Sequence, residues 1–463
     1  MCMADMRIVG IFSGLDTQSI IDKLMALERK PIELLQQKEA RLEQQKAAWQ
    51  KIGQDLNALN AALFDLTLSS TFAAKAAVSS NASILTAQAF STAQLGTYNI
   101  TVTQLAQAQS VASNAYADPT AALNLSGTFQ INGKSITVAT TDSLYSIRDK
   151  INAAGAGVTA TVVLQQTGSY RLVITSQTTG SAGAISFVDD ATTKVLQSLG
   201  ILTSTGAVAN QLTPAQDAVF TVNGLQLTRN SNTVTDAIPG VTLQLQGAGS
   251  VTLNITTDVQ AIKDKIKNFV DKYNALMQDI SEYTKYDPNT KTAGVLMGDA
   301  SLYQLQSSLR RWISDFVSNL PYPYNSLSGI GVTTSGEAPT LSIDDTKLSQ
   351  TLSQAPDKVA QLFSQNSGSA SPSQADGVAV RLSKILNLWL TGTGTTGVGF
   401  LQAKDNYFSQ EIRSIEDQIR SMEERLKVRE RVLWQQFTAM EEFLAQLNAQ
   451  SSWLAQKFAQ LNK

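Results

Sequence analysis

The C-terminal end of the chain carries a long series of apolar residues at helical spacing, and this pattern constrains the fold more than any other feature. Its members are Phe408, Ile412, Ile415, Ile419, Met422, Leu426, Leu433, Phe437, Met440, Leu444, Leu447, Leu454 and Phe458. No glycine or proline occurs between residues 401 and 463. The spacing predicts a single helix, which at 1.5 Å per residue would be on the order of 90 Å long. A helix of this length needs a partner that covers its apolar stripe.

A second apolar stripe near the N-terminus is the natural partner. It contains Leu35, Leu42, Trp49, Ile52, Leu56, Leu59, Leu63 and Leu66. Steps of seven, and then of three and four, form a heptad pattern, which predicts a coiled coil between the two ends of the chain. An antiparallel helical hairpin inside a globular core is the simpler alternative. We expect the residues from Leu42 to Leu63 of this stripe, and those from Ile412 to Phe458 of the C-terminal one, to mediate helix pairing and assembly.

The two stripes are imperfect. Four polar residues fall where the repeat would place a buried apolar one: Lys38, Gln45, Arg429 and Ser451. After Leu433 the register shifts, since Phe437 rather than Gln436 carries the next apolar side chain, and this stutter locally unwinds a supercoil. We expect these positions to weaken the pairing and to permit rearrangement, so that replacing all four polar residues with leucine should stabilise it.

A shorter helix is predicted ahead of the N-terminal stripe. Asp16 is a suitable N-cap for it, since an aspartate side chain can accept hydrogen bonds from the first free backbone N–H groups. Its apolar residues are Ile20, Leu24 and Leu27. Lys30 and Pro31 are expected to break or kink the chain after this helix, because proline restricts the residue before it and favours a helix start.

The middle of the chain changes from helical spacing to alternation of apolar and polar residues. From about residue 78 to residue 255, β-branched residues alternate and glycine-containing turns separate the runs. The segment Phe129–Gly133 recurs as Phe220–Gly224, and each predicts a strand that leads into an Asn-Gly hairpin turn. A short amphipathic helix is expected over Asp142–Ala153. We interpret this region as two small β-rich modules, one inserted into the other.

Helical spacing returns after residue 259 and includes a helix expected over Ile343–Phe363, followed by glycine- and serine-rich loops at Gln365–Asp376 and Thr391–Gly399. The predicted fold class is therefore α+β and multidomain, with paired terminal helices, a helical domain and an inserted β-rich part. We expect five regions: 1–49; 50–77 with 258–403; 78–107 with 205–257; 108–204; and 404–463. At 463 residues the chain is long enough for several domains.

The composition argues against catalysis. The chain has no histidine, which removes the commonest acid–base group and metal ligand, and Cys2 is its only cysteine, so neither a disulfide framework nor a cysteine zinc site is expected within one chain. With a formal net charge of −2 and no long basic run, nucleic-acid binding is not expected. No run of about eighteen apolar residues is present, so we expect no membrane insertion. No catalytic, metal or cofactor site is predicted.

Several acidic and glycine-containing motifs have simpler structural interpretations. Asp344 and Asp345 are expected to cap a helix rather than to act as an acid–base pair. The segment Asp287–Lys291 lacks the spaced carboxylates and closing glutamate of a calcium loop and predicts a hairpin turn. Gly155 and Gly157 follow a helix rather than a strand and suit a helix C-cap better than a dinucleotide loop.

Large aromatic residues are concentrated near the C-terminus. They are Trp434, Phe437, Phe443, Trp453 and Phe458. At helical spacing they belong either to a core or to a subunit interface, and the sequence leaves this choice open.

Several segments together resemble one family, the flagellar hook-associated protein 2 family of filament caps. The resemblance rests on Ile11–Asp16 with Glu28–Pro31, on Asn230–Leu243, on the two repeats that end in Asn-Gly, and on Leu433–Glu441 with Ser451–Leu454. Leu341–Phe363 also fits, whereas residues 111–212 carry little similarity beyond the repeat.

The resemblance implies an architecture and a set of partners. The terminal helices would form a leg that enters the filament end, and the β-rich middle would form a head that assembles with other copies into a plate, usually a pentamer. Its partners would be further copies of the chain, flagellin, the hook–filament junction protein, and the flagellar type III export machinery with its chaperone. Export by that route needs no cleaved signal peptide, so the protein would be secreted to the filament tip. The expected function is to retain exported flagellin and to promote its folding and polymerisation.

Three alternatives compete with this interpretation. The polar middle could bind host mucin or other glycans and contribute to adhesion. The chain could be another axial component, such as a flagellin or a junction protein, although the motifs at both ends disfavour this. An enzyme is the weakest alternative, because the sequence assembles no recognisable active site.

Overall fold

A computed structural model describes residues 13–334, 339–392 and 399–461 of the chain. Cys2, the start of the motif at Ile11 and most of the loop Thr391–Gly399 lie outside the described residues. The chain divides into two compact units. The first comprises the described parts of Met1–Ser69, Lys263–Thr351 and Lys358–Lys463, and the second comprises Ser70–Ile262 with Leu352–Asp357. The predicted α+β class, with helical ends and a β-rich middle, is confirmed.

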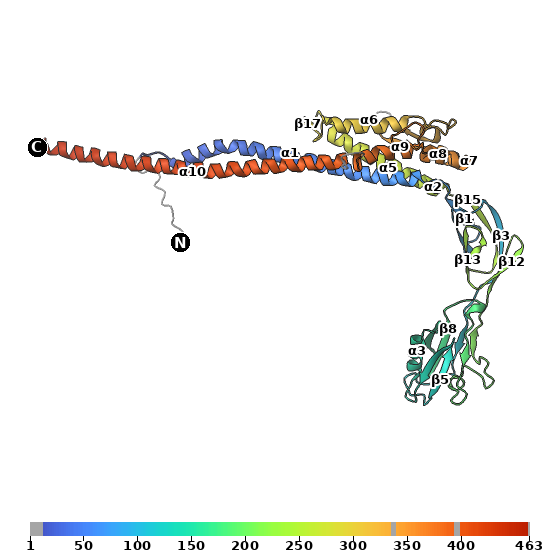
Figure 1. Ribbon diagram of the computed structural model, residues 1–463. Helices are drawn as coiled ribbons and strands as arrows, with labels where there is room; N and C mark the ends of the chain where they lie inside the picture. The colour runs from blue at the N-terminus through green and yellow to red at the C-terminus, as the bar shows by residue number, and fades with distance from the viewer. Residues whose placement is uncertain (1–12, 335–338, 393–398, 462–463) are drawn as a thin grey trace. The chain divides into compact units, whose positions relative to one another are not determined.

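Two long helices dominate the first unit. Helix α1 (Thr17–Thr67) packs along helix α10 (Phe400–Leu461), and both also contact α9 (Val378–Leu390; Figure 1). Asp16 caps α1 as predicted, since its Oδ1 accepts a hydrogen bond from the Ser19 N–H at 3.1 Å. The predicted break at Lys30–Pro31 is wrong, because α1 runs through Pro31 without interruption. Pro31 is exposed, so water can reach the carbonyl group that loses its intrahelical partner there.

The rest of the first unit consists of shorter helices and two small hairpins. The elements, which lie wholly or mostly in this unit, are α5 (Val259–Thr284), α6 (Ala300–Ser314), α7 (Asp345–Gln354), α8 (Pro356–Ser364), β16 (Tyr286–Asp287), β17 (Thr292–Ala293), β18 (Val332–Thr334) and β19 (Leu341–Ile343). The β16–β17 hairpin confirms the turn at Asp287–Lys291. The single helix expected over Ile343–Phe363 is instead a strand end and two helices, because Pro356 starts α8. Asp344 caps α7 as expected, accepting hydrogen bonds from the N–H groups of Thr346 and Lys347.

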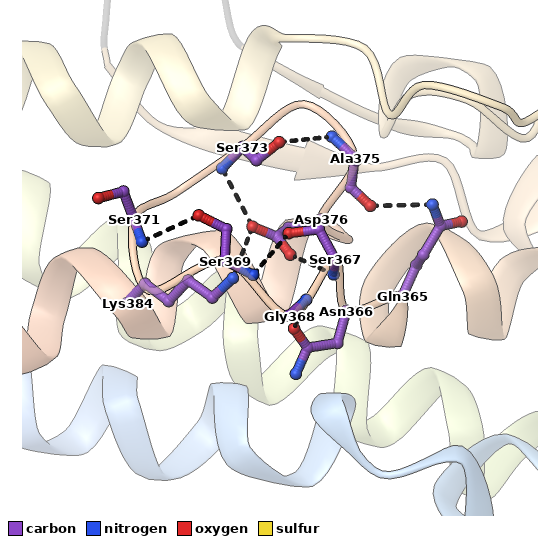
Figure 2. A network of polar contacts seen from close by, with 10 residues as sticks. All are labelled: Gln365, Asn366, Ser367, Gly368, Ser369, Ser371, Ser373, Ala375, Asp376 and Lys384. Atoms are coloured by element: carbon purple, nitrogen blue, oxygen red, sulfur yellow. Dashed lines mark hydrogen bonds and ion pairs between the residues drawn. The ribbon is translucent and has the colours of Figure 1, made fainter.

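A buried carboxylate organises the serine-rich loop that precedes α9 (Figure 2). The side chain of Asp376 is inaccessible to solvent and accepts hydrogen bonds from the N–H groups of Ser367 at 2.8 Å and Ser373 at 3.0 Å. The ammonium group of Lys384, two turns into α9, lies 2.7 Å from the same carboxylate. Burial raises the pKa of Asp376, but Lys384 and the Ser367 N–H lower it more, so the net pKa lies below its usual value. The carboxylate therefore fixes the loop to the helix.

A buried arginine holds the connection after α6. Arg381 is fully buried and donates hydrogen bonds from Nη2 to the Asp315 carbonyl at 2.6 Å and from Nη1 to the Phe316 carbonyl at 3.3 Å. Burial lowers its pKa to about 10. Because both acceptors lie at the C-terminal end of α6, the guanidinium group caps carbonyls that the helix leaves without partners.

The second unit contains two hydrophobic cores. The first core lies between a five-stranded sheet, in the order β1-β15-β3-β11-β12, and a three-stranded sheet, in the order β13-β14-β2. The strands are β1 (Lys75–Ser79), β2 (Leu85–Ala89), β3 (Gly96–Gln104), β11 (Ala218–Val222), β12 (Leu225–Arg229), β13 (Thr233–Ile238), β14 (Val241–Leu245) and β15 (Gly249–Thr257). The short helix α2 (Ser69–Phe72) precedes β1.

The second core is built from the segment between β3 and β11. A four-stranded sheet, in the order β10-β4-β8-β7, and a three-stranded sheet, in the order β6-β5-β9, enclose it together with α3 (Leu144–Ala153) and α4 (Val195–Ser198). The strands are β4 (Ser110–Ala112), β5 (Gly127–Ile131), β6 (Lys134–Val138), β7 (Val158–Gln166), β8 (Ser169–Ser176), β9 (Phe187–Val188) and β10 (Gln211–Thr213). Leu144, Ile147 and Ile151 of α3 are buried in this core, which confirms the amphipathic helix predicted there.

Two Asn-Gly turns connect neighbouring strands in this unit. Asn132, Gly133, Asn223 and Gly224 all have positive φ angles, and each pair joins two adjacent antiparallel strands, which confirms both predicted Asn-Gly turns.

The segment that carries the second core leaves and re-enters the rest of the unit at one place, where Gln107 and Gln216 exchange two backbone hydrogen bonds of 2.7 and 3.1 Å. The β-rich part as a whole also begins and ends at one place, where the Asp258 N–H donates a hydrogen bond to the Ala74 carbonyl at 2.9 Å.

Candidate assembly surface on the terminal helices

The two terminal helices pair in antiparallel fashion with a nearly constant register. Lys46 Nζ donates to Ser409 Oγ at 2.9 Å, and Gln50 Nε2 donates to Asp405 Oδ1 at 2.8 Å. Towards the other end of α1, Arg429 lies 3.3 Å from Glu28. Ser13 donates hydrogen bonds to the buried carboxylate of Glu441, including one from its N–H at 3.3 Å. Among the described residues the paired region therefore ends near Glu441, and α10 continues for about five further turns (Figure 1).

The residues predicted to mediate pairing fall into three classes of burial. Seven are buried: Trp49, Ile52, Leu56, Leu59, Leu63, Ile415 and Leu433. Eight are half-buried: Leu42, Ile412, Ile419, Met422, Leu426, Phe437, Met440 and Leu444. Three are exposed: Leu447, Leu454 and Phe458. The apolar stripe of α10 thus becomes progressively more exposed towards its C-terminal end.

The expectation that polar residues occupy buried positions in the pairing is wrong for three of the four. Lys38, Arg429 and Ser451 are exposed, and only Gln45 is half-buried, where its Nε2 donates to the Val295 carbonyl at 3.1 Å. An ideal helix has 3.6 residues per turn, so a strict seven-residue count drifts away from the contact line by about 20° per heptad. The count therefore identified Lys38 and Arg429 at positions that lie beside the contact rather than in it, whereas Ser451 lies beyond Glu441, where the described pairing ends.

The buried half of α1 belongs to a core that the pattern did not reveal. The ring of Trp49 stacks on that of Trp389 of α9 with centroids 6.3 Å apart, and Phe400 lies edge-on to both. Lys404 Nζ lies 5.1 Å from the Trp49 ring centroid and 3.0 Å from Asp299. Trp389 and Asp299 lie outside both terminal stripes, so heptad counting could not have found them.

Helix α1 has a second apolar face, which the structure leaves exposed. Leu27 and Leu34, one heptad apart, are 64% and 65% exposed, and Val428 of α10 is 55% exposed. Beside them lies an open groove of about 460 Å³ between the two helices, lined among others by Pro31 and Leu426. The seven-residue interval between Leu27 and Leu34 is the sequence signal that could have found this face. Exposed apolar side chains in a row mark a surface that contacts other molecules.

An acidic side chain lies at the contact of the two helices. Burial and the nearby carboxylates of Glu416 on α10 and Glu43 on α1 raise the pKa of Glu39. The folded state therefore binds a proton at Glu39 more tightly than the unfolded chain does, and stability should rise as the pH falls through the folded pKa.

Glu39→Gln is therefore expected to increase the melting temperature at pH 7 slightly, because it removes the carboxylate repulsion while keeping a side chain of similar size. The gain should disappear at acid pH, where Glu39 itself is protonated. Thermal unfolding followed by circular dichroism at several pH values measures both effects, with Glu33→Gln, at an exposed position, as the matched control. Equal melting temperatures for Glu39→Gln and the parent chain at pH 7 would contradict the assigned repulsion.

The described residues suit neither a metal site nor a membrane-spanning segment. Among them, no group of three or more histidine, cysteine, aspartate or glutamate side chains is placed to hold a metal ion. No described helix is both long enough and apolar enough to cross a membrane.

Family models match both ends of the chain. The model described as the flagellar hook-associated protein 2 C-terminus matches residues 215–449, and that described as the N-terminus of the same protein matches residues 13–109. A third model, the flagellin hook IN motif, matches residues 120–178.

Individual relatives agree with the family models. Flagellar hook-associated protein 2 of Escherichia coli K12 is 29% identical over 98% of both chains, and the A-type flagellar hook-associated protein 2 of Pseudomonas aeruginosa is 30% identical over 98% of this chain and 97% of the relative. A crystal structure of the D1–D3 domains of the flagellar cap protein FliD from Escherichia coli has a TM-score of 0.59 at 30% identity and covers 78% of this chain and 99% of that one.

These similarities identify the chain as a structural component of the bacterial flagellum rather than a member of an enzyme family. More specifically, the chain belongs to the flagellar hook-associated protein 2 family, and it is a flagellar filament cap protein.

Proposed function

We propose that copies of this protein assemble at the distal end of the flagellar filament, retain exported flagellin there, and promote its folding and polymerisation. The observation that supports this most directly is the end of α10, where Phe443, Leu447, Trp453, Leu454 and Phe458 are all at least 43% exposed. Large apolar side chains in such a row gain free energy only when another molecule covers them.

The two apolar surfaces of the leg suit a helical partner. The exposed stripe of α10 has steps of four and seven residues, and the groove beside Pro31 is flanked by a second stripe on α1. An amphipathic helix with apolar residues at the same spacing could lie against either surface. The terminal helices of flagellin are the proposed partner, and the contacts would hide the apolar faces of both proteins until the subunit is incorporated.

The remaining assignments rest on the family. We propose that the first unit forms the leg and the second unit forms the head, that heads self-associate into a ring-shaped plate, a pentamer as the resemblance implies, and that the legs meet the hook–filament junction protein before flagellin is added. The protein would reach the extracellular filament tip unfolded, through the flagellar type III export machinery and with its chaperone. Adhesion to host mucin stays a prediction from the sequence alone.

A strain that lacks this protein tests the proposal. Such cells are expected to bear no filaments or very short ones and to release monomeric flagellin into the medium, because nothing retains the exported subunits. Electron microscopy and an immunoassay of the medium measure the two effects, and addition of the purified protein should restore growth. Filaments of normal length without release of flagellin would rule the capping function out.

A further inference from the structure

One sheet of the second unit is almost devoid of charge. In the four strands of the sheet β10-β4-β8-β7, Arg171 of β8 is the only charged residue. One face of this sheet packs on α3 and the second core, whereas on the other face Val163 of β7 and Leu212 of β10 are 47% and 59% exposed. Faces of sheets that remain in water normally carry several charged side chains, so this face has the composition of a covered surface.

The outer face of this sheet, on which Arg171 lies, is hollowed. A groove of about 530 Å³ crosses all four strands, with Ala112 and Val173 among its apolar lining residues and with Gln165, Asn210 and Gln211 supplying amide groups. Arg171 also lines it, held by hydrogen bonds from Nε to Gln165 Oε1 at 2.7 Å and from Nη1 to the Ser113 carbonyl at 2.8 Å. Among the described residues Arg171 forms no ion pair, and no carboxylate lines the groove. Its remaining N–H groups are therefore available to an acceptor from outside.

The groove favours a polypeptide over a sugar. Its described lining residues include no aromatic ring on which a sugar could stack. Interface centres are depleted of lysine and acidic residues and enriched in arginine, which is the composition of this face. Strand β7 is also a sheet edge: Asn152 of α3 pairs with the backbone N–H and C=O of Ala160, but the strand beyond it, with Val163 and Leu164 exposed, carries no charge that would prevent another chain from approaching.

Because the groove combines an apolar lining with Arg171, its ligand should combine an apolar side chain with a carboxylate. Another part of the same unit carries such a combination. Among the exposed large apolar side chains of the described second unit, only Val188, which is 53% exposed, has a carboxylate within two residues. Asp190 follows it in an exposed turn, where its Oδ1 accepts hydrogen bonds from the N–H groups of Thr192 and Thr193. These bonds hold the negative charge in a fixed place next to Val188.

We propose that the Arg171 groove of one copy binds the Val188–Asp190 turn of a second copy, with Asp190 against Arg171 and Val188 on the apolar floor. This inference rests on the proposed self-assembly and names the surface that carries it. Because the two surfaces of the contact differ, each copy can bind one neighbour through its groove and another through its turn, which generates a closed ring when the rotation between copies closes. A plate around a central axis is an assembly of this kind.

Charge reversal in the full-length chain tests the pairing. Arg171→Glu and Asp190→Lys should each weaken self-association by about tenfold or more, because each places like charges against one another. An equimolar mixture of the two variants should associate again into alternating chains, since every contact between unlike variants then joins opposite charges, whereas a closed ring of five would keep one like-charge contact. Lys134→Glu and Asp118→Lys are the matched controls, as both are exposed residues of the same unit outside the groove and the turn, and they should leave association unchanged. Sedimentation velocity over a range of concentrations measures all of these.

A second measurement does not depend on the folding of either charge variant. In a chain with Cys2→Ser, the substitutions Gln165→Cys and Val188→Cys should yield a ladder of disulfide-linked multimers under oxidising conditions, whereas Lys134→Cys with Gln165→Cys should not. Restored association of the mixture together with the ladder supports the proposal.

Three outcomes would overturn the pairing, and they differ in what else they affect. Self-association by both charge variants at the level of the parent chain overturns it while leaving the capping function intact. Loss of binding to flagellin or to a glycan array by Arg171→Glu, with self-association unchanged, also overturns it and assigns the groove to that ligand. A parent chain that does not self-associate at all contradicts both this inference and the proposed plate.

Discussion

A variant in which Leu447, Leu454 and Phe458 are replaced by serine is expected to fold normally and to lose filament capping almost completely. All three side chains are at least 43% exposed and lie C-terminal to Glu441, where the pairing seen in the described residues ends, so their removal costs the isolated chain little. Each would contribute roughly 1.5–3 kcal/mol when a partner buries it fully. Losing all three should weaken binding to the partner by on the order of a thousandfold.

The purified variant can be added to cells that lack the protein, and filament regrowth can be compared with that given by the parent chain. Asn448, Gln450 and Gln456 are exposed on the same stretch of helix, and their replacement by serine is the matched control, with a similar change in helix propensity. We expect the control to restore filaments and the apolar variant not to. Full restoration by the apolar variant would show that the end of α10 is not the contact surface.

Asp376→Ala is expected to destabilise the first unit by about 3–5 kcal/mol, the typical cost of removing one partner from a buried ion pair. The substitution leaves the ammonium group of Lys384, whose side chain is only 16% exposed, without its counterion, and the N–H groups of Ser367 and Ser373 without their acceptor (Figure 2). All five tryptophans, Trp49, Trp312, Trp389, Trp434 and Trp453, belong to the first unit. Tryptophan fluorescence during urea denaturation therefore reports this unit selectively.

The effect of Asp376→Ala should also depend on pH. Because the folded-state pKa of Asp376 lies below its unfolded value, its stabilisation is fully present above about pH 4 and is lost as the pH falls through the folded pKa. The difference between the variant and the parent chain should shrink accordingly in acid. Asp417→Ala removes an exposed carboxylate that pairs with Arg420 one turn away, and it should change the unfolding midpoint very little. Equal unfolding midpoints for Asp376→Ala and Asp417→Ala would contradict the role assigned to the buried pair.

The sequence predicted those parts of the fold that local spacing determines. The spacing of apolar residues and the residue composition were sufficient to predict the two terminal helices, α3 and both Asn-Gly turns, because each of these depends on residues close together in the chain. Pro31 misled the prediction, since the cost of a proline inside a helix depends on whether the carbonyl it frees can reach water. The polar residues Lys38 and Arg429 misled it as well, because a heptad count assumes one straight contact line, and Ser451 did so because the spacing does not show where the partner helix ends.

Features that depend on how separate segments pack together could not be predicted in this way. Asp376 belongs to a segment whose composition indicates only a polar loop, and its burial becomes evident only when α9 and the loop are folded together. The stacking of Trp49 on Trp389 joins two helices that are far apart in the chain. The single charge of the four-stranded sheet is visible in the sequence, but only the strand order shows that the uncharged strands are neighbours.

The chain crossings at Gln107–Gln216 and at Ala74–Asp258 make the β-rich part a nested insertion. Each inserted segment enters and leaves the structure that carries it at two neighbouring backbone positions. The carrying structure therefore has to accommodate only this short, fixed closure, whatever the size of the insertion. Loop-closure entropy changes slowly with length, and a segment closed at its base can grow, shrink or be exchanged without strain on the elements that carry it. The outermost module is therefore free to change in surface and size while the terminal helices keep the contacts that they make with each other.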